Sequence, residues 1–219
     1  MDRLQELQSL FWESTWETLY IVGFALVLGG LGGLILGIAL YVTRRGGILA
    51  NAPVSFVLNI VVNFFRPIPF VIFIAAVQPF ARVVVGTGIG NPAIIFALTL
   101  AAAFGISRIV EQNLVTVDPG VIEAARSVGA GRARIVRTVV LPEALGPLVL
   151  GYTFAFVALV DMTAVAGVIG GGGLGNFALQ YGFRQFDTVV TWTAVIAIVV
   201  LVQVVQLAGN SAARRILRR

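Results

Sequence analysis

The sequence contains no cysteine and no histidine, and all 15 of its basic residues are arginine. Without cysteine the chain has no disulfide bond and no thiol nucleophile, and without histidine it has no imidazole base and no histidine ligand for haem. The usual zinc sites need one or both of these residue types, so only an all-carboxylate metal site would remain. We therefore expect no catalytic residue and no metal site, and most classes of membrane enzyme are excluded.

Charged residues are also scarce: they make up 11% of the 219 residues, whereas 58% are hydrophobic and the mean hydropathy is +0.98. A soluble globular domain carries about 25% charged residues. A hydrocarbon core of about 30 Å needs about 20 apolar residues per helical crossing, so this composition supplies about five crossings. We predict an all-α, polytopic inner-membrane protein in which residues 1–219 form a single transmembrane domain.

Five apolar segments are long enough to cross a membrane. Residues 1–15 precede them and place leucines and aromatic residues at helical spacing, which predicts either an interfacial helix or a loose tail. The second segment is too long for one straight crossing and is interrupted by Arg66, Pro67 and Pro69, so we expect it to bend or break there. The predicted spans are residues 18–42, 52–85, 92–110, 148–169 and 189–208.

Two glycine patterns stand out. Gly29, Gly33 and Gly37 recur every four residues in the first span, which predicts that another helix approaches that face closely. The glycine-rich run of residues 170–175 is not followed by lysine and is not preceded by a strand, so a nucleotide-binding loop is not indicated. We expect this run to end the fourth span and to let the chain turn back closely against a second copy.

The arginines are divided unequally between the two sides of the membrane. Eleven lie in connections on one side, or at the C-terminus on that side, and three lie on the other, namely Arg3, Arg82 and Arg184. The fifteenth, Arg66, lies near the break in the second segment and is not counted on either side. Because positive residues in short loops are retained in the cytoplasm, the richer side is predicted to be inside. With an odd number of spans, the N-terminus is then outside and the C-terminus inside.

The longest polar connection, residues 111–146, lies on the predicted cytoplasmic side and has helical features of its own. Asp118 can cap a helix that begins at Pro119 and stops at Gly129. A second short helix is predicted over residues 132–140, ending at Leu141 and Pro142. Each helix carries an apolar stripe at spacings of three and four. The stripes consist of Val121, Ala125 and Val128 in the first helix and Ile135, Val136, Val139 and Val140 in the second.

The first helix of this connection can act in two ways. Its small residues Ala124, Ala125 and Gly129 can seat in a groove of another protein, and Glu123, expected in its first turn, offers a carboxylate to a cation of that partner. Alternatively, both helices lie on the inner headgroups with their arginines toward anionic lipid. The residue pattern by itself leaves both interpretations open.

The same residues resemble a known motif. Glu123-Ala124-Ala125, Gly129 nearby and Leu141-Pro142 at the end have the spacing of the EAA loop of ATP-binding-cassette importer permeases. Residues 16–209 as a whole resemble the methionine importer permease group. The matching segments are residues 41–44, 66–70, 83–87, 172–175 and 180–182. The resemblance implies a type I importer permease-like fold in which Glu123, Ala124, Ala125, Gly129, Leu141 and Pro142 couple the permease to an ATPase.

The resemblance also implies an assembly: a homodimer, two cytosolic ATP-binding-cassette ATPase subunits and an extracytoplasmic substrate-binding protein. ATP and magnesium would bind to the ATPase subunits, so this chain is expected to hold no cofactor and to catalyse no reaction. The implied task is import of D- or L-methionine by alternating access. Size also favours a dimer, because five helices are too few to enclose a route for an amino acid whereas ten suffice. No nucleic acid partner is expected.

Two charged residues in the spans are candidates for the substrate route. Asp161 lies deep in the fourth span, where an acid usually faces protein or water. It either lines the route together with Met162 and Thr163, or forms a structural hydrogen bond or a pair with Arg66. Arg66 itself is either an intramembrane charge on the route or a side chain that snorkels to the inner interface.

Three other functions compete with methionine import. The same importer class carries other solutes, such as other amino acids or phosphonate. An ion-coupled secondary transporter would need an ion site at the midplane, usually within an inverted repeat, and neither is found. A channel would show a ring of charge, for which Asp161 is the only candidate. Only the importer hypothesis accounts for a helical loop on the cytoplasmic side.

Overall fold

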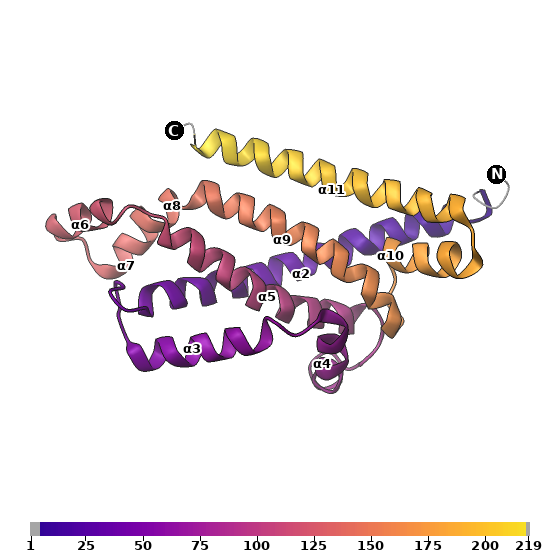
Figure 1. The fold of residues 1–219 in the computed structure, drawn as a ribbon, viewed down its shortest axis with the longest axis horizontal. Coiled ribbons are helices and arrows are strands. Elements are labelled where there is room, and N and C mark those ends of the chain that lie inside the picture. The colour runs from indigo at the N-terminus through magenta and orange to yellow at the C-terminus, as the bar shows by residue number, and fades with distance from the viewer. Residues whose placement is uncertain (1–4, 218–219) are drawn as a thin grey trace.

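The computed structural model describes residues 5–217, and this part of the chain is built of helices without any strand. Four helices are long and apolar enough to cross a membrane. They pack into an elongated bundle, shown in Figure 1. These four are α2 (Gln8–Thr43), α5 (Gly90–Val115), α9 (Leu145–Ala166) and α11 (Thr188–Leu217). The predicted all-α membrane fold is confirmed.

The second apolar segment forms a sharply bent pair of helices. Helix α3 (Ala52–Phe65) and helix α4 (Phe70–Val84) meet at an angle of 111°. The break falls at Arg66, Pro67, Ile68 and Pro69, as predicted, because proline supplies no N–H to continue the helical ladder and restricts the residue before it. If the pair counts as one span, the described chain has five.

The long helices extend past the predicted spans. Helix α2 has 36 residues and is about 54 Å long at 1.5 Å per residue, well over the thickness of a hydrocarbon core. It includes residues 8–15, so this part of the predicted N-terminal element is continuous with the first span rather than a separate helix or tail. Residues 1–4 and 218–219, with Arg3, Arg218 and Arg219 of the arginine count, lie outside the described residues.

The two ends of the bundle have different characters. Helix α2 begins near α10 (Leu174–Phe177), whereas α11 ends at the opposite end, where α6 (Pro119–Ser127) and α7 (Arg132–Ile135) lie (Figure 1). An odd number of crossings requires this separation of the chain ends. The end that holds α6 and α7 also holds most of the loop arginines, so it is the end predicted to face the cytoplasm.

Close packing of α2 against α5 forms the centre of the bundle. A Cβ atom added at Gly29 would lie 2.5 Å from the Cβ of Ala102, and one added at Gly37 would lie 2.5 Å from the Cβ of Val110. At Gly33 the corresponding distance to Ile106 is 2.7 Å. These distances are shorter than any van der Waals contact, so only glycine permits this approach. The predicted glycine packing face is confirmed.

The outer end is fastened by hydrogen bonds to a glycine turn. After α9 the chain forms a short 3-10 helix (Gly167–Ile169), and the glycine run ends the fourth span as predicted. The close contact of this turn with a second copy stays a prediction. The N–H of Gly173 donates to Oε2 of Glu17 at 2.9 Å, and the N–H of Gly172 donates to Oδ1 of Asn91 at 3.0 Å. Nδ2 of Asn91 donates in turn to Oε1 of Glu17 at 3.0 Å. This outer clasp joins α2, α5 and the turn after α9 within one chain.

Candidate functional site

The connection between α5 and α9, which is predicted to be cytoplasmic, is a compact helical unit at one end of the bundle (Figure 1). Helix α5 ends at Val115, and α6 (Pro119–Ser127) follows after three residues. The connection therefore starts later than residue 111, because Glu111 remains in α5, where it pairs with Arg108. Beyond α6 come α7 (Arg132–Ile135), a π-helical turn (Val136–Val140) and α8 (Leu141–Glu143).

Both ends of α6 are set by the residues that the sequence indicates. Oδ1 of Asp118 accepts a hydrogen bond from the N–H of Gly120 at 2.7 Å, which satisfies one of the free donors of the first turn. At the other end Gly129 has φ +78°, a left-handed conformation that favours glycine. The N–H of Ala130 then donates to the carbonyl of Ala125 at 3.1 Å and closes the helix.

Helix α6 has one face against the bundle and one face without a partner among the described residues. Ile122 and Ala125 are partly buried and pack against the main core. On the other side Val121 is 42% exposed and Val128 is 83% exposed, and Ala124 is exposed as well. Glu123 is also exposed, at the edge of a cavity between α6 and the bundle. The predicted stripe is therefore divided, because Ala125 turns toward the bundle while Val121 and Val128 turn away from it.

Glu123 lies one turn later than expected. The first helical residue of α6 is Pro119, so Glu123 is in the second turn, and no acidic residue occupies the first. The helix dipole acts mainly within the first turn and adds little to the charge of Glu123. Within residues 5–217 its carboxylate forms no ion pair, so it remains available to a cation from outside the chain.

The second predicted helix continues further than expected. It does not end at Leu141 and Pro142 but passes through the π-helical turn into α8, and α9 begins at Leu145. Pro142 is accommodated in the first turn of α8, where its missing donor costs little, and the wider turn before it makes room for its ring. Leu141 is partly buried against the core, while Pro142 is exposed.

The apolar stripe of this second helix is the anchor of the cytoplasmic unit. Ile135 and Val140 are at most 1% exposed, and Val136 is also buried. By contrast, α6 has no fully buried residue and lies over a cavity of about 180 Å³. Tyr41, Arg44 and Val117 contribute to the lining of this cavity, and the Arg44 guanidinium lies 4.6 Å from the centre of the Tyr41 ring. Helix α6 is thus exposed, and its contact with the bundle is loosely packed.

Asp118→Ala is expected to loosen α6 without unfolding the bundle. Loss of an N-cap costs about 1 kcal/mol, which corresponds to an increase of about fivefold in local opening of the helix. Hydrogen exchange of the amides of residues 123–127 measures this opening. Asn51→Ala is the matched control, because Asn51 caps α3 in the same way through the N–H of Val54 at 3.1 Å. Unchanged exchange in α6 of the Asp118 variant would contradict the role of the cap.

The candidate residues in the spans lie near one another but face different ways. Arg66 and Met162 together line two adjoining cavities of about 190 and 200 Å³ between α4, α5 and α9. Thr163 is buried and donates a hydrogen bond to the carbonyl of Val160 at 2.6 Å. Asp161 is exposed on the surface of α9 and forms no ion pair with Arg66.

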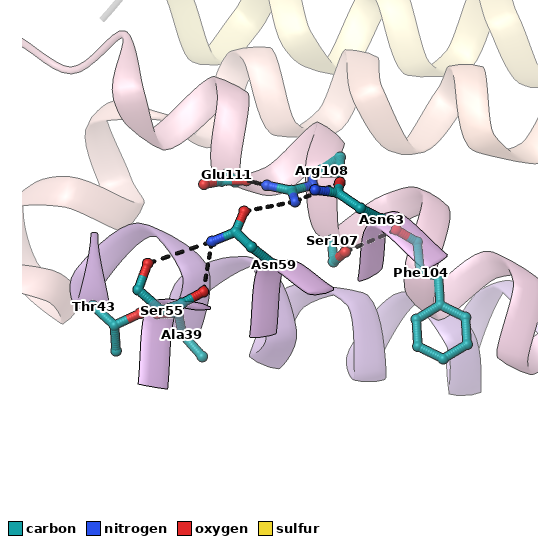
Figure 2. Close-up of polar contacts among 9 residues, drawn as sticks. All are labelled: Ala39, Thr43, Ser55, Asn59, Asn63, Phe104, Ser107, Arg108 and Glu111. Atoms are coloured by element: carbon teal, nitrogen blue, oxygen red, sulfur yellow. Dashed lines mark hydrogen bonds and ion pairs between the residues drawn. The ribbon is translucent and has the colours of Figure 1, made fainter. Parts of the chain in front are cut away.

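A partly buried polar cluster lies between α3 and α5 (Figure 2). Asn59 and Asn63 are polar residues of the second span that could bond across helices, whereas the roles of Arg108 and Glu111 were not predicted from the sequence. Arg108 donates to Oδ1 of Asn59 at 2.7 Å and to Oδ1 of Asn63 at 2.8 Å, and it forms an ion pair with Glu111. Ser55 continues the series, since its carbonyl accepts from Nδ2 of Asn59 at 2.7 Å. The available signal was the polar spacing of four in α3, at positions 55, 59 and 63. We call these five residues the Arg108 cluster.

Comparison of this chain with known proteins identifies the family to which it belongs. Residues 29–219 match the family of binding-protein-dependent transport system inner membrane components. A probable D-methionine transport system permease protein MetI of Vibrio cholerae is 40% identical over 93% of this chain and 90% of that protein. The methionine import system permease protein MetP of Bacillus subtilis is 39% identical, over 91% and 90%.

A solved structure is similar to this chain at about the same level of sequence identity. A chain of the MetNI methionine ABC transporter in an inward-facing conformation superposes with a TM-score of 0.93 at 41% identity, covering 96% of this chain and 98% of that chain. The similarity extends over nearly the whole length of both sequences and includes the cytoplasmic helices. The chain is therefore a multi-pass protein of the inner membrane and belongs to the family of binding-protein-dependent transport system inner membrane components.

Proposed function

We propose that this chain is the transmembrane permease subunit of an ATP-driven importer that carries methionine into the cytoplasm. The match to MetNI, at 41% identity with a TM-score of 0.93, is the observation that carries the proposal. Relatives from two distant bacteria are both named for methionine transport. The import of another solute by the same machinery is the principal alternative, because the cytoplasmic helices do not depend on the substrate.

Helix α6 is the proposed point of contact with a cytosolic ATPase subunit. Its exposed face combines an unpaired carboxylate, Glu123, with the small residue Ala124 and the apolar side chains of Val121 and Val128. Such a face fits a groove that offers a cation. Ala125, Gly129, Leu141 and Pro142 belong to the same coupling unit, and the ATP and magnesium would bind to the partner subunit.

A homodimer is the proposed membrane unit. Asp161 lies exposed on α9 beside an apolar surface that includes Phe154, which is 68% exposed. A carboxylate at this depth is costly against lipid and normally faces protein or a water-filled space. A second copy about a twofold axis would cover this face and supply ten spans around one route. An extracytoplasmic binding protein would deliver the substrate to the outer end.

We place the substrate route beside Arg66, Asp161 and Met162. Arg66 and Met162 line the same two cavities, with the stacked rings of Phe65 and Phe104 as part of one wall. Thr163 supports the route by position only, because its hydroxyl is already bonded within α9. Alternating access follows if the ATPase subunits bind the inward and outward states with different affinities. The arginine distribution favours an N-terminus outside and a C-terminus inside.

The proposal predicts ATP-dependent methionine uptake. The chain is reconstituted in vesicles with its ATPase subunit and binding protein, and uptake of radiolabelled methionine is measured with and without ATP. We expect uptake only with ATP and hydrolysis. ATP-dependent uptake of a different solute but not of methionine would contradict the substrate, and uptake driven by a proton or sodium gradient without ATP would contradict the mechanism.

Met162→Ala is expected to lower methionine uptake by about tenfold, because it removes a large apolar contact from the proposed route. Binding of the ATPase subunit should not change. Leu207→Ala is the matched control, since Leu207 is 61% exposed on α11 and lines neither cavity. Equal uptake by the two variants would remove Met162 from the route.

A further inference from the structure

We infer that Arg108 is a positioning residue for transport, which fastens α3 to α5 so that a displacement of α6 is passed to the bent pair of α3 and α4. This inference rests on the proposed function, because it concerns how the motion of the coupling helix reaches the membrane. It concerns the Arg108 cluster, which lies outside both the α6 surface and the cavities beside Arg66.

The contacts of Arg108 reach across two helices in a fixed geometry (Figure 2). Nη2 donates to Asn59 at 2.7 Å and to Asn63 at 2.8 Å, both in α3. Nη1 forms the ion pair with Glu111, one turn further along α5. The planar guanidinium presents its donors in a rigid fork, so this arrangement fixes both the distance and the rotation of α3 relative to α5.

The charges of the cluster balance one another in a partly buried position. The side chains of Arg108 and Glu111 are 12% and 17% exposed and carry opposite charges. Arg108 lies seven residues before the end of α5, about 10 Å from it along the helix. Taking a charged pair out of water is costly unless further hydrogen bonds satisfy it, and the two asparagine oxygens do so here.

Apart from this cluster, α3 is weakly attached to the bundle. Val62 is its only buried residue, and Phe65 stacks on Phe104 at its far end. Leu58 is partly buried, and most of the remaining apolar side chains face outward, among them Phe56 at 67% and Val57 at 57% exposure. The Arg108 cluster is therefore the principal cross-link along the middle of α3.

The order of the elements gives the cluster its role. Three residues separate α5 from α6, and α5 is locked to α2 by the glycine packing, so a displacement of α6 would carry α5 and α2 with it. Helix α3 leads directly into the break at Arg66 and into α4, which form part of the cavities on the proposed route. Arg108 connects the moving body to this bent pair.

The double variant Asn59→Leu and Asn63→Leu tests the inference while the ion pair of Arg108 with Glu111 stays intact on α5. In the reconstituted transporter we expect methionine transported per ATP hydrolysed to fall about tenfold, with ATPase binding and hydrolysis retained. Ser55→Ala is the control, because Asn59 keeps the backbone carbonyl of residue 55 as its acceptor. Arg108→Lys should recover part of the coupling that Arg108→Met loses.

A distance measurement separates positioning from a general structural role. Because the chain has no cysteine, single cysteines introduced for spin labels at Val57 on α3 and Val115 on α5 are the only thiols in it. We expect the distance between the two labels of one protomer to be narrow and equal in the nucleotide-free and ATP-bound transporter, and to broaden or change between these states in the double variant. Unchanged distances and unchanged transport per ATP in the double variant would overturn the inference. Absence of methionine uptake by the unmodified chain would instead contradict the proposed function.

Discussion

Replacing Glu123 by arginine is expected to abolish copurification with the ATPase subunit and, with it, ATP-dependent uptake. The exposed carboxylate of Glu123 has no ion-pair partner within residues 5–217, so a cation of the partner is its expected contact. Bringing a positive charge against that cation both removes an attraction and adds a repulsion, which weakens binding by about 30-fold or more. Affinity purification from membranes, followed by a binding isotherm, measures the loss.

The control for this prediction is Glu143→Arg, the same charge reversal on the exposed surface of α8. It changes the net charge of the cytoplasmic end equally and should retain binding. If Glu123→Arg copurifies as well as the unmodified chain, or if a cross-linker at position 123 captures only phospholipid, α6 lies on the headgroups and the coupling proposal fails.

The double substitution Gly33→Ala and Gly37→Ala is expected to destabilise the whole bundle. A Cβ at Gly37 would lie 2.6 Å from the carbonyl oxygen of Ser107 and 2.5 Å from Val110, and the Cβ at Gly33 meets Ile106 at 2.7 Å. The backbones must separate, and overpacking of this kind costs about 1 to 3 kcal/mol at each site. Thermal unfolding in detergent should show a marked drop in midpoint, accompanied by reduced yield.

Gly23→Ala is the matched control in the same helix, since a Cβ there meets no atom within 4 Å. Alanine favours helix over glycine by about 1 kcal/mol, so this variant should be as stable as the unmodified chain or slightly more stable. An equal loss of stability in both variants would mean that the close approach of α2 and α5 does not govern stability.

Much of this architecture could be predicted because each feature has a local cause. Apolar length defines the spans, the spacing of four at Gly29, Gly33 and Gly37 defines a packing face, and Pro67 and Pro69 define the break. The ends of the helices were harder to predict. Hydropathy changes where lipid ends, whereas the hydrogen-bond ladder of α2 continues through residues 8–15 and that of α5 continues past Glu111.

At the candidate sites, too, features with a local cause could be predicted and features that depend on distant contacts could not. The cap at Asp118 and the stop at Gly129 follow from local backbone chemistry, and both were correctly predicted. The stop at Pro142 was wrong, because a π-helical turn absorbs the proline ring. Asn59 and Asn63 could be recognised as polar groups able to bond across helices, but their partner Arg108 could not be predicted, because the sequence gives no distance between α3 and α5, and an arginine near the end of a span resembles a loop residue.

In the proposed importer, the outer clasp would restrict where substrate can enter. Glu17 and Asn91 tie α2 and α5 to the turn that follows α9, and Thr18 adds a further bond by accepting from the N–H of Leu174 at 2.8 Å. Three crossings of one chain are thereby joined at the end predicted to be extracytoplasmic and resist separation from one another. In the proposed homodimer, an opening for substrate on that side would then form at the interface between the two protomers, and each protomer would move as a rigid body.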